Sequence, residues 1–283
     1  MEERRIHVIT ASHNRREITL AFAQSLKAQT HQNIHLILVD DGCTDGTAEA
    51  VLNCLPNTTV LQGNGNLWWG GSLHLAYKYL RDHQGDSLED GVLISNDDVI
   101  LPQAYIKTAM ALLQEHPGTL ISGCGYDAAT GKLVDGAYRR DFTHREPEAV
   151  EYVPAFEDGD VCSSRSLFTT VGDFLKIGGF HPILLPHYAS DYAWTAKATK
   201  KGYKIKMCPE LSYQFDYSAT GDNFYDSLTA KKAFSRRSAA NPFYKFTYIL
   251  LSTPKKYLLS ELWWQIKRYG TKWRTIWEVL KRK

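Results

Sequence analysis

Acidic residues follow two apolar stretches that are predicted to be buried strands. The pair at 40–41 (Asp-Asp) comes directly after Val39, and the triplet at 96–98 (Asn-Asp-Asp) comes directly after Ser95. A third acidic position, Asp191, opens a predicted helix much later in the chain. In open α/β sheets, ligands bind beyond the carboxyl ends of the strands. We therefore expect a nucleotide and a divalent metal ion at the two acidic strand ends, and a general base in the separate carboxylate.

Hydrophobic periodicity predicts the elements that must position these residues. Buried strands and amphipathic helices alternate up to about residue 118, which predicts a mostly parallel sheet with helices on both faces. Pro102 suits the start of a further helix, where proline is tolerated. The predicted strands cover residues 6–10, 34–39, 59–61 and 92–95, and the predicted helices cover 17–30, 47–55 and a segment that ends near residue 83.

The pattern changes after about residue 118. We expect residues 1–220 to form one domain and residues 221–283 to form a helical tail. Gly202 suits the position just after a helix end. The further predicted elements are a turn at 128–132, a strand and a short helix within 158–180, a helix at 192–201 and a strand at 204–208.

Composition limits the classes of protein to consider. Of the 283 residues 43% are hydrophobic, which predicts a globular protein with a sizeable core. A net charge of +2 gives no indication of nucleic-acid binding. The five cysteines are odd in number and form no Cys-x-x-Cys pair, so neither a disulfide framework nor a zinc site is expected. The first residues lack the apolar core of a signal peptide and no stretch of about 18 uncharged apolar residues occurs, which predicts a cytoplasmic protein.

Beyond Leu251 the chain is basic and amphipathic. This segment contains nine lysines and arginines and two glutamates, so its net charge is +7, and the net charge of the rest of the chain is −5. A basic amphipathic helix that bears tryptophan is typical of a segment in a membrane interface, and we favour that interpretation over packing on the domain or on another subunit. The apolar positions, which recur at three- and four-residue steps, are Leu259, Leu262, Trp263, Ile266, Trp273, Ile276, Trp277 and Leu280.

Three segments, taken in order and with their spacing, resemble family-2 glycosyltransferases of the GT-A fold. They are residues 8–15 (VITASHNR), 25–30 (SLKAQT) and 39–47 (VDDGCTDGT). The resemblance extends over roughly residues 6–215. It implies a GT-A-like α/β sandwich with a mostly parallel central sheet and C-terminal helices. It also implies an enzyme that transfers a sugar from a nucleoside diphosphate sugar.

The resemblance implies a nucleotide site around Asp41. A carboxylate only accepts hydrogen bonds, and the N3–H group of uracil or thymine donates one. Asp41 would therefore contact the base, and Asp40 would lie towards the base or the ribose. The backbone at Ala11 and His13 would line the same pocket. The alternative is that Asp40, like Asp45, caps a turn or a helix.

Residues 96–98 occupy the place of the family's Asp-x-Asp motif, with Asn96 in place of the first aspartate. Mg²⁺ and Mn²⁺ prefer hard oxygen ligands and are commonly shared between one or two carboxylates and substrate phosphates. The resemblance implies that Asp98 ligates the metal and that Asp97 meets the ribose or the sugar. Asn96 removes one negative charge from the motif. A polar turn before Pro102 is the alternative.

The loop at 63–71 (GNGNLWWGG) is rich in glycine, asparagine and tryptophan. It follows the third predicted strand and has Trp68 where a dinucleotide-binding fingerprint requires glycine, which disfavours a dinucleotide site. In the resembling family this region passes under the diphosphate and the donor sugar. Gly70 and Gly71 would then present backbone N–H groups to phosphate, and Trp68 or Trp69 would stack on a sugar or base. Structural packing of the two tryptophans is the alternative.

Asp191 matches the position of the family's catalytic base, in a segment where Ser190 replaces the usual glutamate. A positioned base is needed to remove the proton of the acceptor hydroxyl as it attacks the anomeric carbon. An ordinary aspartate is ionised at neutral pH. Capping of the helix is the alternative. Further candidates for metal or acceptor contacts are His181, His187, Asp158 and Asp160.

Together these observations favour an inverting, metal-dependent glycosyltransferase with a UDP- or dTDP-sugar donor and a glycan or lipid-linked glycan acceptor. The Asn-x-Asp form and the loop at 65–69 resemble rhamnosyltransferase-like members, which suggests dTDP-rhamnose. The expected setting is cell-surface polysaccharide synthesis on the inner face of a bacterial membrane. Two alternatives stay open: a nucleotide-sugar-binding assembly protein without catalysis, and a nucleotidyltransferase. Against the second, the chain lacks a glycine-rich triphosphate loop after its first strand.

Overall fold

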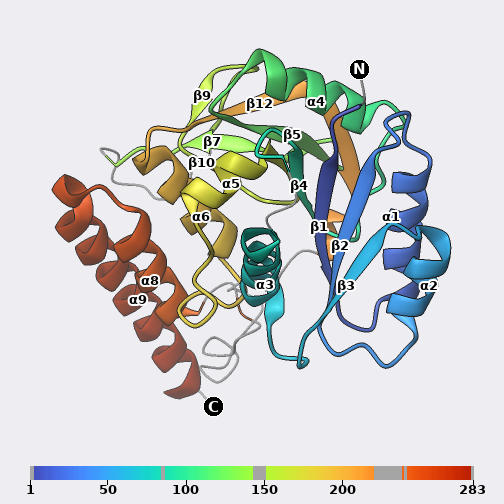
Figure 1. Cartoon of the computed structure of the whole chain (residues 1–283). Coiled ribbons are helices and arrows are strands. Elements are labelled where there is room, and N and C mark those ends of the chain that lie inside the picture. Colours follow the sequence, from blue (N-terminus) through green and yellow to red (C-terminus); the bar gives the residue numbers. More distant parts are fainter. Residues whose placement is uncertain (1–2, 84–86, 143–150, 220–237, 239–240, 282–283) are drawn as a thin grey trace.

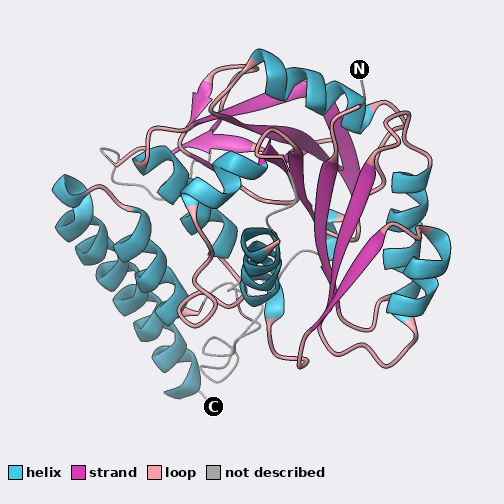
Figure 2. Ribbon diagram, viewed as in Figure 1, coloured by secondary structure: helices cyan, strands magenta, loops and turns pink. Residues whose placement is uncertain are grey.

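The computed structural model describes residues 3–83, 87–142, 151–219, 238 and 241–281, with the backbone alone for residues 151, 219 and 271–281. A large sheet runs through the molecule with helices on both faces, and a pair of helices lies to one side (Figure 1, Figure 2). This sheet positions the candidate site, because the loops that follow its parallel strands meet at one edge.

Four parallel strands form the first half of the sheet. Their order is β3 (Thr58–Gln62), β2 (Ile34–Asp40), β1 (Ile6–Ser12) and β4 (Gly91–Ser95). The helices that connect or follow them are α1 (Arg16–Lys27), α2 (Thr47–Cys54), α3 (Trp68–Asp82) and α4 (Tyr105–Glu115). The alternation agrees with the prediction, since neighbouring parallel strands need a long crossover connection, usually a helix. Ser12 pairs with Asp40, so β1 and β2 end at the same level.

The second half of the sheet contains antiparallel strands. β11 (Ser166–Thr170) lies between β4 and β5 (Thr119–Asp127) and runs antiparallel to both. β12 (Lys204–Phe215) pairs parallel with β5, and the sheet ends at β9 (Asp158–Gly159). β6 (Leu133–Asp135) adds to β5, while β10 (Val161–Cys162), β7 (Ala137–Arg139) and β8 (Glu151–Tyr152) form a small second sheet.

Periodicity predicted this second half less completely. The predicted turn at 128–132 is confirmed by a hydrogen bond from the Gly131 N–H to the Asp127 carbonyl (2.8 Å), and α5 (Val171–Ile177) and α6 (Ser190–Lys200) lie where helices were expected. The strand predicted at 204–208 continues to Phe215, across an irregular stretch that contains Pro209. Proline normally marks a strand edge or bulge, which hid this continuation from the pattern.

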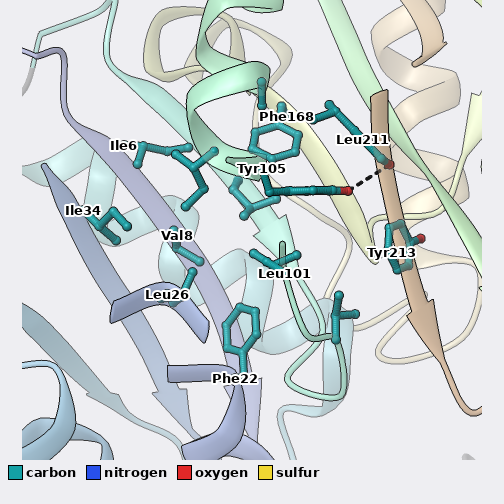
Figure 3. Close-up of a cluster of buried hydrophobic side chains, with 14 of the residues drawn as sticks. Ile6, Val8, Phe22, Leu26, Ile34, Leu101, Tyr105, Phe168, Leu211 and Tyr213 are labelled. Atoms are coloured by element: carbon teal, nitrogen blue, oxygen red, sulfur yellow. Dashed lines mark hydrogen bonds between the residues drawn. The ribbon is translucent and has the colours of Figure 1, made fainter. Parts of the chain in front are cut away.

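Side-chain alternation along the strands divides the core into two layers. On β1, Ile6 and Val8 face one side of the sheet and Ile9 faces the other. The first layer packs against α1, α2 and α4, and Figure 3 shows part of it, with Phe22 and Leu26 of α1 against β1. The second layer packs against α3, α5 and α6. Full burial of a large apolar side chain contributes about 1.5–3 kcal/mol, so these layers fix the strands whose ends form the site.

The C-terminal helices α8 (Pro242–Ser252) and α9 (Leu258–Lys281) lie side by side, with α8 against α6 (Figure 1). Tyr244 of α8 packs on Ala193 of α6, and the Lys200 ammonium donates to the carbonyl of Leu251 (2.7 Å). A helical tail was predicted, and the division into domains at residue 220 stays a prediction. Within the described ranges, none of the helices combines the length and the hydropathy that a bilayer-spanning segment requires.

Tyr105 provides a test of how α4 is joined to the second half of the sheet. Its buried hydroxyl donates to the Leu211 carbonyl of β12 (3.1 Å, Figure 3) and lies 2.7 Å from Ser166 Oγ of β11. Tyr105→Phe leaves both partners buried without this hydroxyl, so we expect the free energy of unfolding to fall by about 1–3 kcal/mol in urea titrations. The control is Tyr217→Phe, which removes a hydroxyl from an exposed side chain. This variant should change the free energy of unfolding far less. Equal effects would contradict this role for Tyr105.

Candidate active site

A cleft of about 900 Å³ opens beyond the carboxyl ends of β1, β2 and β4. Its walls also include the start of α3, the loop before α6, the short strands around β6 and β7, and one side of α8. The sequence-predicted residues that line it are Ala11, His13, Asp41, Trp68, Trp69, Asp97, Asp98, His187 and Asp191. The fold therefore brings the three acidic segments to one place. Asp40, Gly70, Gly71, Asp158, Asp160 and His181 are not among the described residues that line it.

Asp41 holds the loop that leads into α3. One carboxylate oxygen accepts the N–H of Gly65 (2.8 Å), and the other accepts those of Leu67 (2.9 Å) and Trp68 (3.0 Å). These bonds support an unusual backbone, because Trp68 has φ +58°, in the left-handed region that a residue with a side chain rarely adopts. The predicted contact of Asp41 with a nucleobase stays a prediction. The structure adds a second role, which is to fix the shape of the loop.

The other nucleotide-site candidates lie around this loop. Asp40 is buried, and its carboxylate accepts the N–H of Cys43 (2.6 Å), which is the turn-capping alternative considered above. The His13 imidazole lies 2.7 Å from the Asp41 carbonyl oxygen through Nδ1. Asp45 accepts the N–H of Thr47 (3.1 Å) at the start of α2. The segment therefore borders the cleft, and Asp41 is the one of its three acids that lines it, while its role as a nucleotide site stays a prediction.

Gly70 and Gly71 serve close packing in this structure. The Gly70 N–H donates to the Pro186 carbonyl (2.7 Å), and the Gly71 N–H donates to the Leu67 carbonyl (3.1 Å). A Cβ atom at Gly70 would collide with the Leu185 carbonyl and with the side chain of Ser190. Glycine is therefore required because the start of α3 lies directly against the segment before α6. The predicted phosphate contacts of these two N–H groups stay a prediction without support from this geometry.

The two adjacent tryptophans play different parts. Trp69 packs against the core layer beneath α3, and its indole N–H donates to Ser164 Oγ (3.0 Å). The Trp68 ring lies in the cleft wall, 5.4 Å from the ring of His187. Trp68 is therefore the better placed of the two to stack on a ligand, while Trp69 follows the packing alternative more closely.

Asp97 and Asp98 have different surroundings although they are neighbours. Asp97 is 2% exposed, forms an ion pair with Arg15 (2.9 Å) and accepts the Thr19 hydroxyl (2.8 Å). Desolvation by burial raises the pKa of Asp97, against the opposing effect of Arg15. The Asp98 side chain is 27% exposed and pairs with Arg165 (2.8 Å) and, at 3.5 Å, with Arg15. Asp98 is thus the more accessible carboxylate of the motif.

Asp135 and Arg165 belong to the site, although the sequence did not indicate them. Asp135 ends β6, is buried in the cleft wall and accepts the Tyr213 hydroxyl (2.9 Å). Arg165 precedes β11 and reaches Asp135 through Nε (3.3 Å). Desolvation raises the pKa of Asp135. A three-residue strand carries no periodic signal, so only the folded arrangement connects Asp135 with the acidic strand ends.

Asp191 lies at the first turn of α6 with its carboxylate in the cleft. One oxygen accepts the Ser164 N–H (3.1 Å), and the other accepts the N–H of Tyr192 (2.9 Å). Burial raises the pKa of Asp191, and these two N–H groups oppose that effect. An aspartate with a raised pKa binds a proton more readily than an exposed one, which suits a general base. The helix-capping alternative does not account for its position in the cleft.

The Asp41 bonds give a testable expectation for stability. Asp41→Asn replaces one accepting oxygen by an N–H₂ group that faces backbone N–H donors, so we expect the free energy of unfolding to fall by about 1–3 kcal/mol in urea titrations. The matched control is Asp45→Asn, where asparagine caps a helix about as well as aspartate, and a much smaller change is expected. Equal losses would show that the Asp41 carboxylate does not hold the loop.

Comparisons with known proteins agree with this geometry. The family model described as glycosyl transferase family 2 matches residues 7–168, more than half of the chain. N-acetylglucosaminyl-diphospho-decaprenol L-rhamnosyltransferase from two strains of Mycobacterium tuberculosis is 32% identical over 82 residues. That match covers 28% of this chain and 27% of the relative, so the chain spans about a quarter of the curated relatives it matches.

Solved glycosyltransferases share the fold. Mannosyltransferase PcManGT from Pyrobaculum calidifontis, in complex with GDP-Man and Mn²⁺, superposes with a TM-score of 0.54 and 16% identity, over 89% of this chain and 62% of that one. TarS 1-349 of S. aureus superposes with a TM-score of 0.59 and 16% identity, over 98% of this chain and 91% of that one. The predicted GT-A-like sandwich is thereby confirmed. On its matching sequence and its fold, this chain belongs to glycosyl transferase family 2 and is a glycosyltransferase.

Proposed function

We propose that this protein transfers a sugar from a nucleoside diphosphate sugar to an acceptor hydroxyl with inversion at the anomeric carbon. The observation that carries the proposal is the meeting of Asp98 and Asp191 in one cleft, although 92 residues separate them in the chain. The family supplies the reaction class. A single displacement needs a base on one side of the reacting carbon and charge stabilisation on the other. Asp191 would supply the base, and a divalent metal ion held by Asp98 would supply the charge stabilisation.

Asp191 is the proposed base. It accepts the proton of the acceptor hydroxyl while the hydroxyl oxygen forms the new glycosidic bond and the nucleoside diphosphate leaves. The bonds from Ser164 and Tyr192 orient its carboxylate. Because burial raises the pKa of Asp191, we expect activity to fall on acidification at a higher pH than for a base with the pKa of an exposed aspartate.

Asp98 is the proposed ligand of a divalent metal ion, Mg²⁺ or Mn²⁺. Its carboxylate is an accessible hard oxygen donor in the cleft. Among the described residues, no group of three or more histidine, cysteine, aspartate or glutamate side chains is gathered closely enough to hold a metal ion alone. This arrangement fits a site that substrate phosphates complete, which is common for Mg²⁺. When bound, the metal would neutralise charge on the leaving diphosphate.

The donor is proposed to be a UDP- or dTDP-sugar, and dTDP-rhamnose is the first candidate. The mycobacterial relative is named as an L-rhamnosyltransferase. Asp41, with Ala11 and His13, lines the end of the cleft beyond β1 and β2, where a nucleotide is expected in such a sheet. Trp68 adds an aromatic face beside this region.

Replacement of Asp191 tests the base. Asp191→Asn keeps the size of the side chain but removes the proton acceptor, so we expect the transfer rate to fall by about 10²–10⁴-fold. Binding of UDP or dTDP, measured by calorimetry, should be retained. The control is Asp82→Asn at the exposed far end of α3, which should transfer at the wild-type rate. Wild-type transfer by Asp191→Asn would remove the base assignment. A wild-type protein that binds nucleotide sugars but never transfers would instead support the assembly-protein alternative.

The acceptor is proposed to be a glycan or a lipid-linked glycan. Aromatic side chains from α6 and the loop before it, from α8, from the small second sheet and from the end of β12 line the cleft, and such rings suit the apolar faces of sugars. They are Tyr138, Tyr152, Tyr188, Tyr192, Phe215 and Tyr248. Lys245 of α8 lies in the same wall. The mycobacterial relative is named for a diphospho-decaprenol-linked acceptor, which supports the lipid-linked form and a role in cell-surface polysaccharide synthesis.

The C-terminal helices are proposed to rest on an anionic membrane surface. On α9, Leu259, Trp263 and Ile266 are exposed at steps of four and three residues, so they share one face. The Lys267 ammonium lies 5.1 Å from the Trp263 ring centre, and Lys255 and Lys256 are exposed just before the helix. A basic, tryptophan-bearing amphipathic surface of this kind suits anionic lipid. The side chains of Trp273, Ile276, Trp277 and Leu280 lie outside the described residues.

Because α8 lines the cleft with Lys245 and Tyr248 and packs against α9, membrane attachment through α9 would bring the cleft close to lipid-linked acceptors. The proposed location is therefore peripheral, on the inner face of the membrane.

Vesicle flotation tests this attachment. In the full chain, the triple variant Leu259→Ser, Trp263→Ser, Ile266→Ser should float poorly with phosphatidylglycerol vesicles, while the wild type floats and is released by high salt. The control is Leu88→Ser, which removes an exposed apolar side chain before β4. Equal flotation of wild type and triple variant would refute attachment through this face.

A further inference from the structure

Arg165 joins two carboxylates that come from different walls of the cleft. Its Nη1 lies 2.8 Å from Asp98, which follows β4, and its Nε lies 3.3 Å from Asp135, which ends β6. Its guanidinium also lies over the Phe215 ring, 3.9 Å from the ring centre. The side chain is only 11% exposed. In this structure the guanidinium thus lies next to the carboxylate that we assign to the metal.

The backbone around Arg165 is held against the same acidic motif. The Arg165 carbonyl accepts the N–H of Asn96 (3.3 Å), and the following residue, Ser166, pairs with Ser95 across β11 and β4. The side chain therefore leaves the backbone beside the motif and returns to Asp98. This contact depends on the antiparallel insertion of β11 next to β4.

Asp135 acts as an anchor for the guanidinium. Its carboxylate accepts the Tyr213 hydroxyl (2.9 Å) and the Gly136 N–H (2.9 Å), so its position is fixed independently of Arg165. If Asp98 exchanged Arg165 for another cation, Asp135 would still hold Nε of the arginine in the cleft, and the Nη1 group that had paired with Asp98 would be released.

Arg15 is a less suitable partner for such an exchange. It is 39% exposed, and its nearer partner is the buried Asp97 at 2.9 Å, whereas Asp98 lies 3.5 Å away. Loss of Arg15 from Asp97 would leave a buried carboxylate without its counter-ion, which is costly. Arg15 is therefore expected to stay with Asp97.

We propose that Arg165 is an exchangeable counter-ion of the donor site: it pairs with Asp98 when the cleft is empty, and it turns to the donor diphosphate when a metal ion occupies Asp98. Two cations at one carboxylate repel each other, so metal and Arg165 compete for Asp98 in the empty cleft. A diphosphate removes this competition because it offers anionic oxygens to the guanidinium. This inference rests on the proposed function, and it explains how metal and donor would favour each other's binding.

The proposal predicts effects of opposite sign when the arginine charge is removed. An opposite charge within about 4–6 Å changes the affinity of a carboxylate for a proton by roughly one to three orders of magnitude. Mn²⁺ is also a cation, so Arg165 should lower the affinity of Asp98 for Mn²⁺ in the same way. Arg165→Gln should therefore bind Mn²⁺ about tenfold more tightly in the absence of donor. It should bind UDP or dTDP about tenfold more weakly when Mn²⁺ is saturating, since a charge-assisted hydrogen bond to phosphate is lost.

The measurements are free Mn²⁺ by electron paramagnetic resonance in titrations of the nucleotide-free full chain, and calorimetry of UDP and dTDP binding with saturating Mn²⁺. The matched control is Arg81→Gln, an exposed arginine at the far end of α3, which should leave both affinities unchanged. Arg165→Lys keeps the charge on a single ammonium and should leave Mn²⁺ affinity near the wild-type value while nucleotide affinity falls. Arg165→Lys also tests the exchange if Arg165→Gln does not fold.

The outcomes separate this inference from the function it rests on. Unchanged Mn²⁺ affinity in a folded Arg165→Gln protein overturns the exchange. A parallel loss of both affinities also overturns it and assigns Arg165 a purely structural role. If the wild type itself binds no Mn²⁺ with or without nucleotide, the proposed metal site fails, and the exchange fails with it. If the wild type binds Mn²⁺ but the variant does not bind it more tightly, only the exchange fails.

Discussion

Among the described residues, five carboxylates line one cleft, and their mutual repulsion is the constraint on which the rest of the site depends. Each must be offset locally, because like charges at short range in a poorly solvated region are strongly unfavourable. The protein uses three kinds of partner: backbone N–H groups, arginines and hydroxyls. The acids are Asp41, Asp97, Asp98, Asp135 and Asp191. Where the partner is a rigid backbone donor, as at Asp41 and Asp191, the acid stays in place. At Asp98 the partner is the arginine Arg165, and this is the pair that we propose to be exchangeable.

Much of the frame could be predicted from sequence because its signals are local. Strand and helix periodicity locates β1, β2, β4 and the helices between them, and the rule for parallel strand ends then brings Asp41 and Asp98 together. Asp191 followed only from the resemblance, since no local pattern connects a helix start at residue 190 with strand ends about a hundred residues earlier. The comparisons confirm the family and the fold.

The remainder depends on contacts between distant segments. The insertion of β11 between β4 and β5 brings Arg165 to Asp98, and the short β6 brings Asp135 to the same guanidinium. Neither segment has a sequence pattern that specifies its neighbour. Likewise, the glycines at 70–71 suggested phosphate binding, because a helix start rich in glycine is typical of both anion sites and close packing. Only the position of the segment before α6 shows that packing requires Gly70.

The contact at Gly70 also limits how two parts of the cleft wall, the start of α3 and the segment before α6, can move relative to each other. The start of α3, which carries Trp68, lies against the backbone that leads to Asp191, and the Gly70 N–H donates a hydrogen bond to the Pro186 carbonyl across that junction. The two segments are packed so closely that a Cβ atom at Gly70 would not fit, so a shift of one segment relative to the other would break this hydrogen bond. Under the proposed function, the junction would help to fix the spacing between leaving group and base. Widening of the cleft for a bulky saccharide would then occur more easily away from this junction.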